Sequence, residues 1–189
     1  MTGSDSIRAF VAFDLPASVR SVIKREQDAI RAEMPKARWT RPEGQHVTLK
    51  FLGETPKSRL ESLSEAIAGG VVGIGAVEVC LAGSGFFPGP RRPRVAWIGG
   101  EARGGREVAA AVENAAATVG FDPDRRPWSL HLTQARLDRP WSRRAVETFL
   151  DWGRGLDIEP FICRNVVLFR SDLRPGGAVY TALERYPLD

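Results

Sequence analysis

The residue types that build metal centres and covalent frameworks are scarce in this sequence. It has two cysteines and two histidines among 189 residues. Cys80 and Cys163 lie far apart, each within an apolar alternating stretch, so they predict buried, reduced thiols rather than a disulfide framework. Two histidines and two distant cysteines cannot form a zinc site by spacing, and we therefore expect no metal.

Long apolar stretches and nucleotide-binding motifs are missing as well. The apolar run within residues 1–16 is too short for a signal peptide, and no stretch could span a bilayer. We therefore expect a cytoplasmic protein without membrane contact. The P-loop pattern Gly-x-x-x-x-Gly-Lys-Ser/Thr does not occur, so nothing supports an ATP-driven ligase. The Gly-x-Ser-x-Gly pattern of serine hydrolases does not occur either.

What the sequence does contain is a soluble composition with an excess of positive charge. Hydrophobic residues make up 43% and charged residues 26%, which is typical of a globular domain. The formal net charge is +4, which favours an anionic partner without separating nucleic acid from nucleotide or acidic surface. Most of the positive charge is arginine, which suits bidentate contacts to phosphate, although genome composition can also enrich it.

Hydrophobic periodicity predicts an alternation of short strands and amphipathic helices. In the first half, strands are predicted at 8–14, 46–53 and 77–81, and helices at 16–34 and 60–68. In the second half, strands are predicted at 94–100, 129–135, 161–169 and 178–186, and helices at 108–119 and 142–152. Gly69 and Gly70 are predicted to stop the 60–68 helix, and Ser142 to cap the 142–152 helix.

The order strand, helix, histidine strand, helix, strand occurs twice. Val11 precedes His46 by 35 residues, and Val95 precedes His131 by 36. We predict one domain, 1–189, made of two duplicated lobes at roughly 1–86 and 94–189, with room for strands exchanged near the termini. The alternative is that α+β proteins often alternate elements in this way. The Pro-, Gly- and Arg-rich segment between the halves, Phe86 to Arg94, predicts an exposed loop, whose arginines either contact nucleic acid or are simply solvated.

Both histidines lie in the same local pattern. His46 and His131 are each followed two residues later by a threonine, Thr48 and Thr133. On a strand such residues point to the same face, so two lobes packed face to face could bring both pairs to one cleft. A single His-x-Thr is explained as well by a histidine hydrogen-bonding at a strand edge. Two copies in matching places would arise by chance in roughly one of several hundred cases.

These residue types suit the cleavage of a phosphodiester. Histidine titrates near neutrality, so one copy can accept a proton from water while the other donates one to the departing oxygen. Imidazoles on opposite sides of a phosphorus match the in-line geometry of attack and departure. Threonine hydroxyls can donate hydrogen bonds to the non-bridging oxygens as negative charge grows there.

The chain resembles the 2H phosphoesterase superfamily, and within it the bacterial and archaeal RNA 2′,3′-cyclic phosphodiesterases, also described as 2′-5′ RNA ligases. The resemblance rests on segments in family order: RAFVAFDLP, Trp39 with HVTLKFLGE, PRVAWIG, HLTQAR and SDLRPGGAVYTAL. It implies an α+β, bilobal fold whose antiparallel sheets and helices surround a central cleft. It also implies hydrolysis of a 2′,3′-cyclic phosphate at an RNA or nucleotide end to a 2′-phosphomonoester, without metal or cofactor.

The resemblance implies residue roles as well. His46 would donate a proton to the leaving 3′ oxygen and His131 would activate water, an order that the local sequence does not establish. Arg136 stands where the family carries a phosphate-contacting arginine. Phe51, five residues after His46, either stacks on a base or packs in the core. Arg136 and Phe51 have the wrong parity for the histidine-bearing face, so we expect their strands to end or twist there.

Two positions depart from the family pattern. Gln134 replaces a usual apolar residue, and Trp128-Ser129-Leu130 stands where the family usually has Phe-Thr-Pro. Gln134 should face away from the cleft, so we expect it to affect packing rather than chemistry. Two alternatives remain open: a hydrolase of another cyclic or 2′-5′ phosphodiester, and a non-catalytic RNA-binding module. We expect a monomer whose partners are RNA ends or nucleotides.

Overall fold

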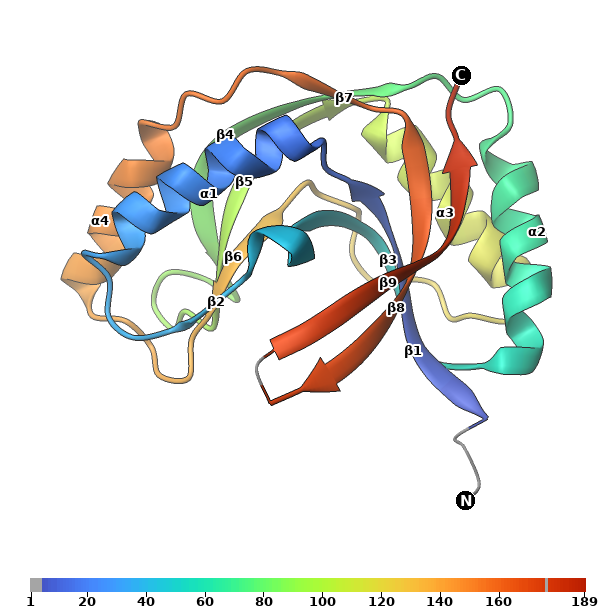
Figure 1. Cartoon of the computed structure of the whole chain (residues 1–189), viewed down its shortest axis with the longest axis horizontal. Helices are drawn as coiled ribbons and strands as arrows, with labels where there is room; N and C mark the ends of the chain where they lie inside the picture. The colour runs from blue at the N-terminus through green and yellow to red at the C-terminus, as the bar shows by residue number, and fades with distance from the viewer. Residues whose placement is uncertain (1–4, 176) are drawn as a thin grey trace.

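The computed structural model describes residues 5–175 and 177–189 and contains helices and strands in alternation (Figure 1). Its strands are β1 Ser6–Asp14, β2 Arg38–Trp39, β3 His46–Pro56, β4 Val77–Phe87, β5 Val95–Arg103, β6 Leu132–Arg136, β7 Phe161–Cys163, β8 Asn165–Arg174 and β9 Gly177–Pro187. Its α-helices are α1 Ala17–Arg31, α2 Leu60–Val71, α3 Gly105–Thr118 and α4 Arg143–Arg154. Among the described residues, no helix is both long and apolar enough to cross a bilayer.

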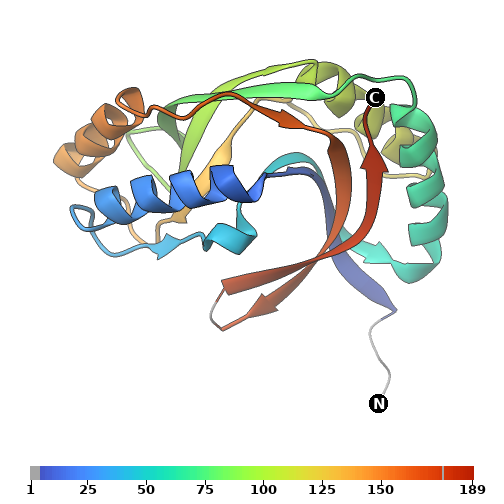
Figure 2. The ribbon, with the colours of Figure 1, turned by 45° about the horizontal axis from the view of Figure 1, so that its top comes forward.

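All the strands join one curled sheet. Its order is β7-β4-β5-β6-β3-β1-β8-β9, with β2 paired to β6, and every pairing is antiparallel. Helices α1 and α4 lie beside one end of the sheet, and α2 and α3 beside the other (Figures 1 and 2). The predicted fold class, α+β with antiparallel sheet and helices, is confirmed.

The sheet mixes the two halves of the chain. Strand β4, from the first half, pairs with β5 and β7, whereas β8 pairs with β1 and carries β9 beside it. Strands from opposite ends of the sequence therefore build each half of the sheet. The internal duplication and its boundaries stay a prediction.

Two apolar clusters hold the sheet to its helices. The larger contains the fully buried Val47, Ile98 and Leu132 and packs against residues of α2 and α3. The smaller includes Ala96 and Ala135 from the sheet and packs against α1 and α4. Full burial of an aliphatic side chain contributes about 1.5–3 kcal/mol, so these contacts fix which strand face is turned away from solvent.

Several predicted boundaries are wrong. Helix α2 continues through Gly69 and Gly70 to Val71, and a Cβ on Gly70 would make ordinary contact with α3, 3.4 Å from the Ala111 carbonyl oxygen. Gly70 therefore lies at the contact between α2 and α3 and does not end the helix. The predicted 161–169 strand is divided at Arg164 into β7 and β8.

The elements next to the second histidine also differ from their prediction in detail. Strand β6 begins at Leu132, so His131 immediately precedes it. Phe86 and Phe87 belong to β4, which shortens the predicted connecting loop to residues 88–94. The predicted cap of α4 is confirmed, since the Ser142 hydroxyl accepts a hydrogen bond from the Ala145 amide.

Candidate active site

The two His-x-Thr motifs lie on neighbouring antiparallel strands. Val47 and Leu132, the middle residues of the motifs, are cross-strand partners and both are fully buried. Side chains alternate along a strand, so both histidines and both threonines project from the opposite face. This register sets His46 across from Thr133 and Thr48 across from His131. Diagonal neighbours in such a pair are about 7–8 Å apart, which leaves the two imidazoles on either side of a small space.

Both imidazoles are anchored to the backbone in the same way. Nδ1 of His46 lies 2.8 Å from the Gly44 carbonyl oxygen, and Nδ1 of His131 lies 3.0 Å from that of Ser129. A carbonyl oxygen only accepts hydrogen bonds, so each Nδ1 must be the donor. Nε2 of each ring is therefore the nitrogen that can exchange a proton with a ligand.

The electrostatic surroundings of His46 favour its neutral form. The pKa of His46 is lowered to about 4, mainly by burial and in addition by the positive charges of His131, Arg20 and Arg136, against the opposing effect of its bond to Gly44. Ring contacts account for the burial: Phe10 lies 4.5 Å from His46 between centroids, and Tyr180 lies 5.0 Å away, edge-on. The imidazole is therefore uncharged at neutral pH when no ligand is bound.

A cleft of about 310 Å³, here called the histidine cleft, opens above these rings. Of the predicted site residues, five line it: His46, Thr48, Phe51, Thr133 and Arg136. Within the described part of the chain, neither threonine hydroxyl has a hydrogen-bond partner, so both are free to bind a ligand oxygen.

His131 is not among the lining residues of the histidine cleft. It is partly buried beside it, with its ring edge-on to Phe87 at a centroid distance of 5.1 Å. The charge of His131 nevertheless affects the pKa of His46. The two imidazoles thus belong to one electrostatic unit, although only one of them forms a wall of the cleft.

Two β-bulges explain how Phe51 and Arg136 reach the cleft. Leu49 is an extra residue in β3, because Ala12 pairs with Thr48 while Val11 pairs with Lys50. An extra residue reverses the alternation of side chains, so Leu49 and Lys50 both point away and Phe51 returns to the histidine face.

The second motif contains the same irregularity at the same place. Trp97 pairs with Thr133 while Ala96 pairs with Ala135, so Gln134 is the extra residue. Gln134 and Ala135 are both buried, and Arg136 returns to the cleft. The expected parity conflict is therefore resolved by bulges within the pairing, not by strand ends or twist alone.

Gln134 faces away from the cleft, as predicted. Its side-chain oxygen accepts a hydrogen bond from Gln27 Nε2 on α1 at 3.1 Å, and its backbone oxygen accepts one from the Thr40 amide at 2.8 Å. Trp128, the other departure, donates from its indole Nε1 to the Thr48 carbonyl oxygen at 2.8 Å. This bond joins the segment before one motif to the backbone of the other.

Three residues from distant strands complete the cleft and were not predicted: Arg8, Phe10 and Tyr180. Burial raises the pKa of Tyr180, while the charges of Arg136 and Arg8 oppose the rise. Both cations therefore lie near the same phenol. Nothing in the local sequence identifies these residues, because their position depends on the pairing of β1 with β3 and of β9 with β8.

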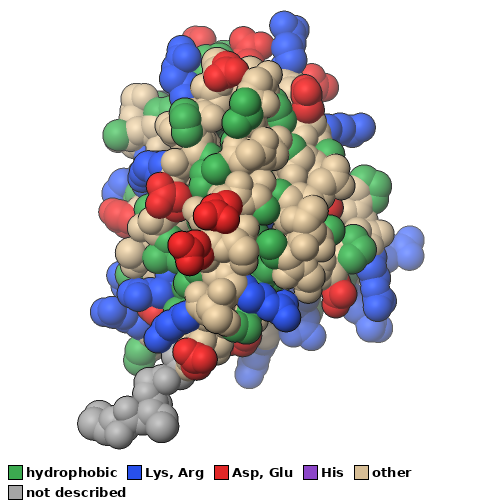
Figure 3. Space-filling view, turned by 90° about the vertical axis from the view of Figure 1, so that its right-hand side faces the viewer, with side chains coloured by type: hydrophobic (Ala, Val, Ile, Leu, Met, Phe, Trp, Pro, Cys, Tyr) green, Lys and Arg blue, Asp and Glu red, His purple; other side chains and the backbone are tan. Residues whose placement is uncertain are grey.

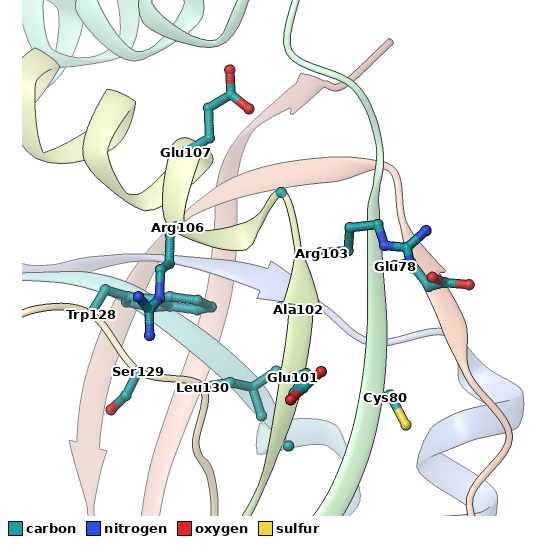
Figure 4. A pocket seen from close by; sticks show the side chains of 12 residues that line it. Glu78, Cys80, Glu101, Ala102, Arg103, Arg106, Glu107, Trp128, Ser129 and Leu130 are labelled. Atoms are coloured by element: carbon teal, nitrogen blue, oxygen red, sulfur yellow. The ribbon is translucent and has the colours of Figure 1, made fainter.

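The remaining surface offers no comparable constellation among the described residues. A larger hollow of about 550 Å³ has residues 128–130 in its wall and contains charges of both signs, with Arg106 beside Trp128 (Figure 4). None of the predicted site residues lines it. Neither histidine is visible on the face that Figure 3 shows. Within residues 5–175 and 177–189, no group of three His, Cys, Asp or Glu side chains is placed to hold a metal ion.

Comparisons with known sequences find phosphoesterases. The family model of LigT-like phosphoesterases matches residues 13–97. A Thermus thermophilus protein named RNA 2′,3′-cyclic phosphodiesterase is 32% identical over 195 residues, covering 96% of this chain and 90% of that protein. A protein of the same name from Methanothermobacter thermautotrophicus is 29% identical, with coverage of 96% and 99%.

Two solved structures have a similar fold over nearly the whole chain. A crystal structure of a Thermus thermophilus protein superposes with a TM-score of 0.79 at 26% identity, covering 96% of this chain and 98% of the other. The crystal structure of E. coli LigT complexed with 3′-AMP superposes with a TM-score of 0.71 at 25% identity, with coverage of 97% and 98%.

Proposed function

The chain belongs to the LigT-like phosphoesterase family of RNA 2′,3′-cyclic phosphodiesterases, and we propose that it opens such a phosphate by acid–base catalysis with His46 and His131. The substrate is an RNA or nucleotide end that carries the cyclic phosphate, and the product is a 2′-phosphomonoester. The observation that carries the proposal is the cross-strand pairing of Val47 with Leu132, which brings the two motifs together.

The reaction needs one proton removed and one supplied. Nε2 of His131 accepts a proton from water, and the water oxygen forms a bond to phosphorus. The bond from phosphorus to the 3′ oxygen breaks, and Nε2 of His46 donates a proton to that oxygen. Each such proton transfer typically contributes about 10²–10⁴-fold to the rate. The order of the two roles comes from the family resemblance.

The donor role requires His46 to be protonated, although its pKa is lowered to about 4 in the absence of ligand. A bound cyclic phosphate brings a negative charge beside the ring. This charge raises the pKa of His46 and offsets the positive charges of Arg20 and Arg136. Substrate binding thus supplies the condition that the donor needs.

The other cleft residues hold the substrate. The hydroxyls of Thr48 and Thr133 donate to the non-bridging oxygens, whose charge grows as water attacks. Arg136 adds a cation that can bind one of these oxygens with two N–H groups. Phe51, 55% exposed at the rim of the cleft, offers its ring to the terminal base.

The test is incubation with an oligonucleotide that ends in a 2′,3′-cyclic phosphate, with and without a chelator, followed by separation of the 2′- and 3′-phosphate products. We expect the 2′-phosphate, no effect of the chelator, and a loss of at least about 100-fold in kcat for His46→Ala and for His131→Ala. A 3′-phosphate product, activity that depends on a divalent ion, or full activity in either variant would contradict the mechanism. A non-catalytic RNA-binding module would bind the oligonucleotide without turning it over.

A further inference from the structure

A second aromatic surface lies on the far side of His131 from the histidine cleft. Trp97 of β5 is the cross-strand partner of Thr133, so its side chain projects from the face that carries the motifs. The indole is partly buried, and the mechanism proposed above does not use it.

Two glycines allow the Trp97 ring to lie flat on the sheet. Gly85 is its cross-strand partner on β4, and Gly99 follows two residues later on the same face. A Cβ on Gly85 would lie 2.3 Å from the indole, and one on Gly99 would lie 2.9 Å from it. One face of the ring therefore rests on the bare backbone of these glycines, and its Nε1 is buried with no hydrogen-bond partner among the described residues.

Phe87 links this ring to the catalytic pair. Its ring centroid lies 5.3 Å from that of Trp97 and 5.1 Å from that of His131. Aromatic side chains thus lie on both sides of the two imidazoles, with Phe10 and Tyr180 at His46 and the pair Phe87–Trp97 at His131.

Positive charge lies in the loop that follows this second aromatic surface along the chain. The loop 88–94 begins one residue after Phe87, and its Arg91, Arg92 and Arg94 are all exposed, with Arg91 bordering a hollow beside α4. The Arg94 amide donates to the Phe87 carbonyl oxygen at 2.8 Å, which ties the end of the loop to the aromatic pair. A flat ring beside exposed arginines is the combination that binds single-stranded nucleic acid, with a base on the ring and phosphates near the cations.

We propose that Trp97, flanked by Phe87, stacks on the base of the nucleotide that precedes the cyclic phosphate, while Arg92 and Arg94 of the loop bind the phosphates on its 5′ side. The substrate class is then an RNA end of two or more nucleotides rather than a cyclic mononucleotide. This inference rests on the proposed function. A stacked base typically changes affinity by a factor of about 5 to 150, and we expect a gain of that size in kcat/KM.

The test compares three substrates with the wild-type enzyme: a nucleoside 2′,3′-cyclic phosphate, a dinucleotide ending in the same group, and that dinucleotide with an abasic 5′ residue. We expect the intact dinucleotide to have the highest kcat/KM and the abasic one to lose most of the gain. Equal values for the intact and abasic dinucleotides would overturn the stacking role of Trp97 and leave the cyclic phosphodiesterase intact. If no substrate is hydrolysed, both proposals fall.

Variants supply the second measurement. Trp97→Leu is expected to lose the dinucleotide advantage while keeping its rate on the cyclic mononucleotide, and Trp97→Phe should recover part of the advantage. Trp39→Leu is the matched control, because Trp39 packs near Trp141 in the α1–α4 cluster. An equal loss on both substrates in Trp97→Leu would mean that the ring only supports His131, and would refute the subsite.

Discussion

The ionisation of His46 gives the most direct test of the electrostatics of the site. A pKa lowered from 6.5 to about 4 corresponds to about 3 kcal/mol of coupling between ionisation and folding. The folded pKa lies below the unfolded one, so between pH 6.5 and 4 the unfolded chain binds a proton that the folded protein does not. The stabilisation is fully present above pH 6.5 and is lost as the pH falls to about 4.

Replacing the His46 imidazole with a side chain that does not titrate isolates its contribution to the free energy of unfolding. We expect the free energy of unfolding of the wild type to fall between pH 7 and pH 4 by about 3 kcal/mol more than that of His46→Gln, measured by urea denaturation at both pH values. Glutamine keeps an N–H donor for the Gly44 carbonyl but does not titrate. The same loss in both proteins would show that His46 is not the group concerned.

Nuclear magnetic resonance offers an independent readout, because the chain has two histidines. The His131→Asn variant leaves His46 as the only imidazole, and we expect its pKa to rise, since a positive charge that opposes its protonation has been removed. A His46 ring that titrates near 6.5 in the wild type would refute the argument from burial.

Three further substitutions test other contacts of the site. Arg136→Ala is expected to lower kcat/KM by about 10- to 100-fold, as for the loss of a hydrogen bond to a charged group, and to raise the pKa of His46. Trp128→Phe removes the donor to the Thr48 carbonyl and should lower kcat by up to about tenfold with little change in KM. Lys50→Met should lower the free energy of unfolding by about 2 kcal/mol, because the fully buried ammonium group bonds a carboxylate of α3 at 2.7 Å.

Each of these has a control or a contrary outcome. Trp141→Phe is the control for Trp128→Phe, because the Trp141 Nε1 is buried with no hydrogen-bond partner among the described residues. An equal fall in kcat for both would remove any special role of the bond to Thr48. Unchanged kcat/KM in Arg136→Ala would exclude phosphate contact by that residue. An unchanged urea midpoint in Lys50→Met would mean that the buried ion pair contributes no net stability.

Local pattern was enough to predict the motifs and most of the elements, because side-chain alternation and helical periodicity depend on neighbours in the sequence. It could not predict the bulges at Leu49 and Gln134, which exist only relative to a partner strand. For the same reason, simple alternation predicted that Phe51 and Arg136 would point away from the histidine-bearing face. The contributions of Arg8 and Tyr180 to the cleft were missed because strand pairing between the ends of the chain decides them.

The two motifs are alike in anchoring, so any division of acid and base roles must come from their surroundings. Both imidazoles hold a backbone carbonyl through Nδ1, and both strands bulge immediately after the threonine. The symmetry ends at the fifth residue after each histidine, where one strand presents the ring of Phe51 and the other the cation of Arg136. Arg136 lowers the pKa of His46, and the rings around His46 bury it. A ligand that brings negative charge therefore changes the protonation of His46 more than that of a freely solvated histidine, and the substrate itself helps to set which imidazole carries the proton.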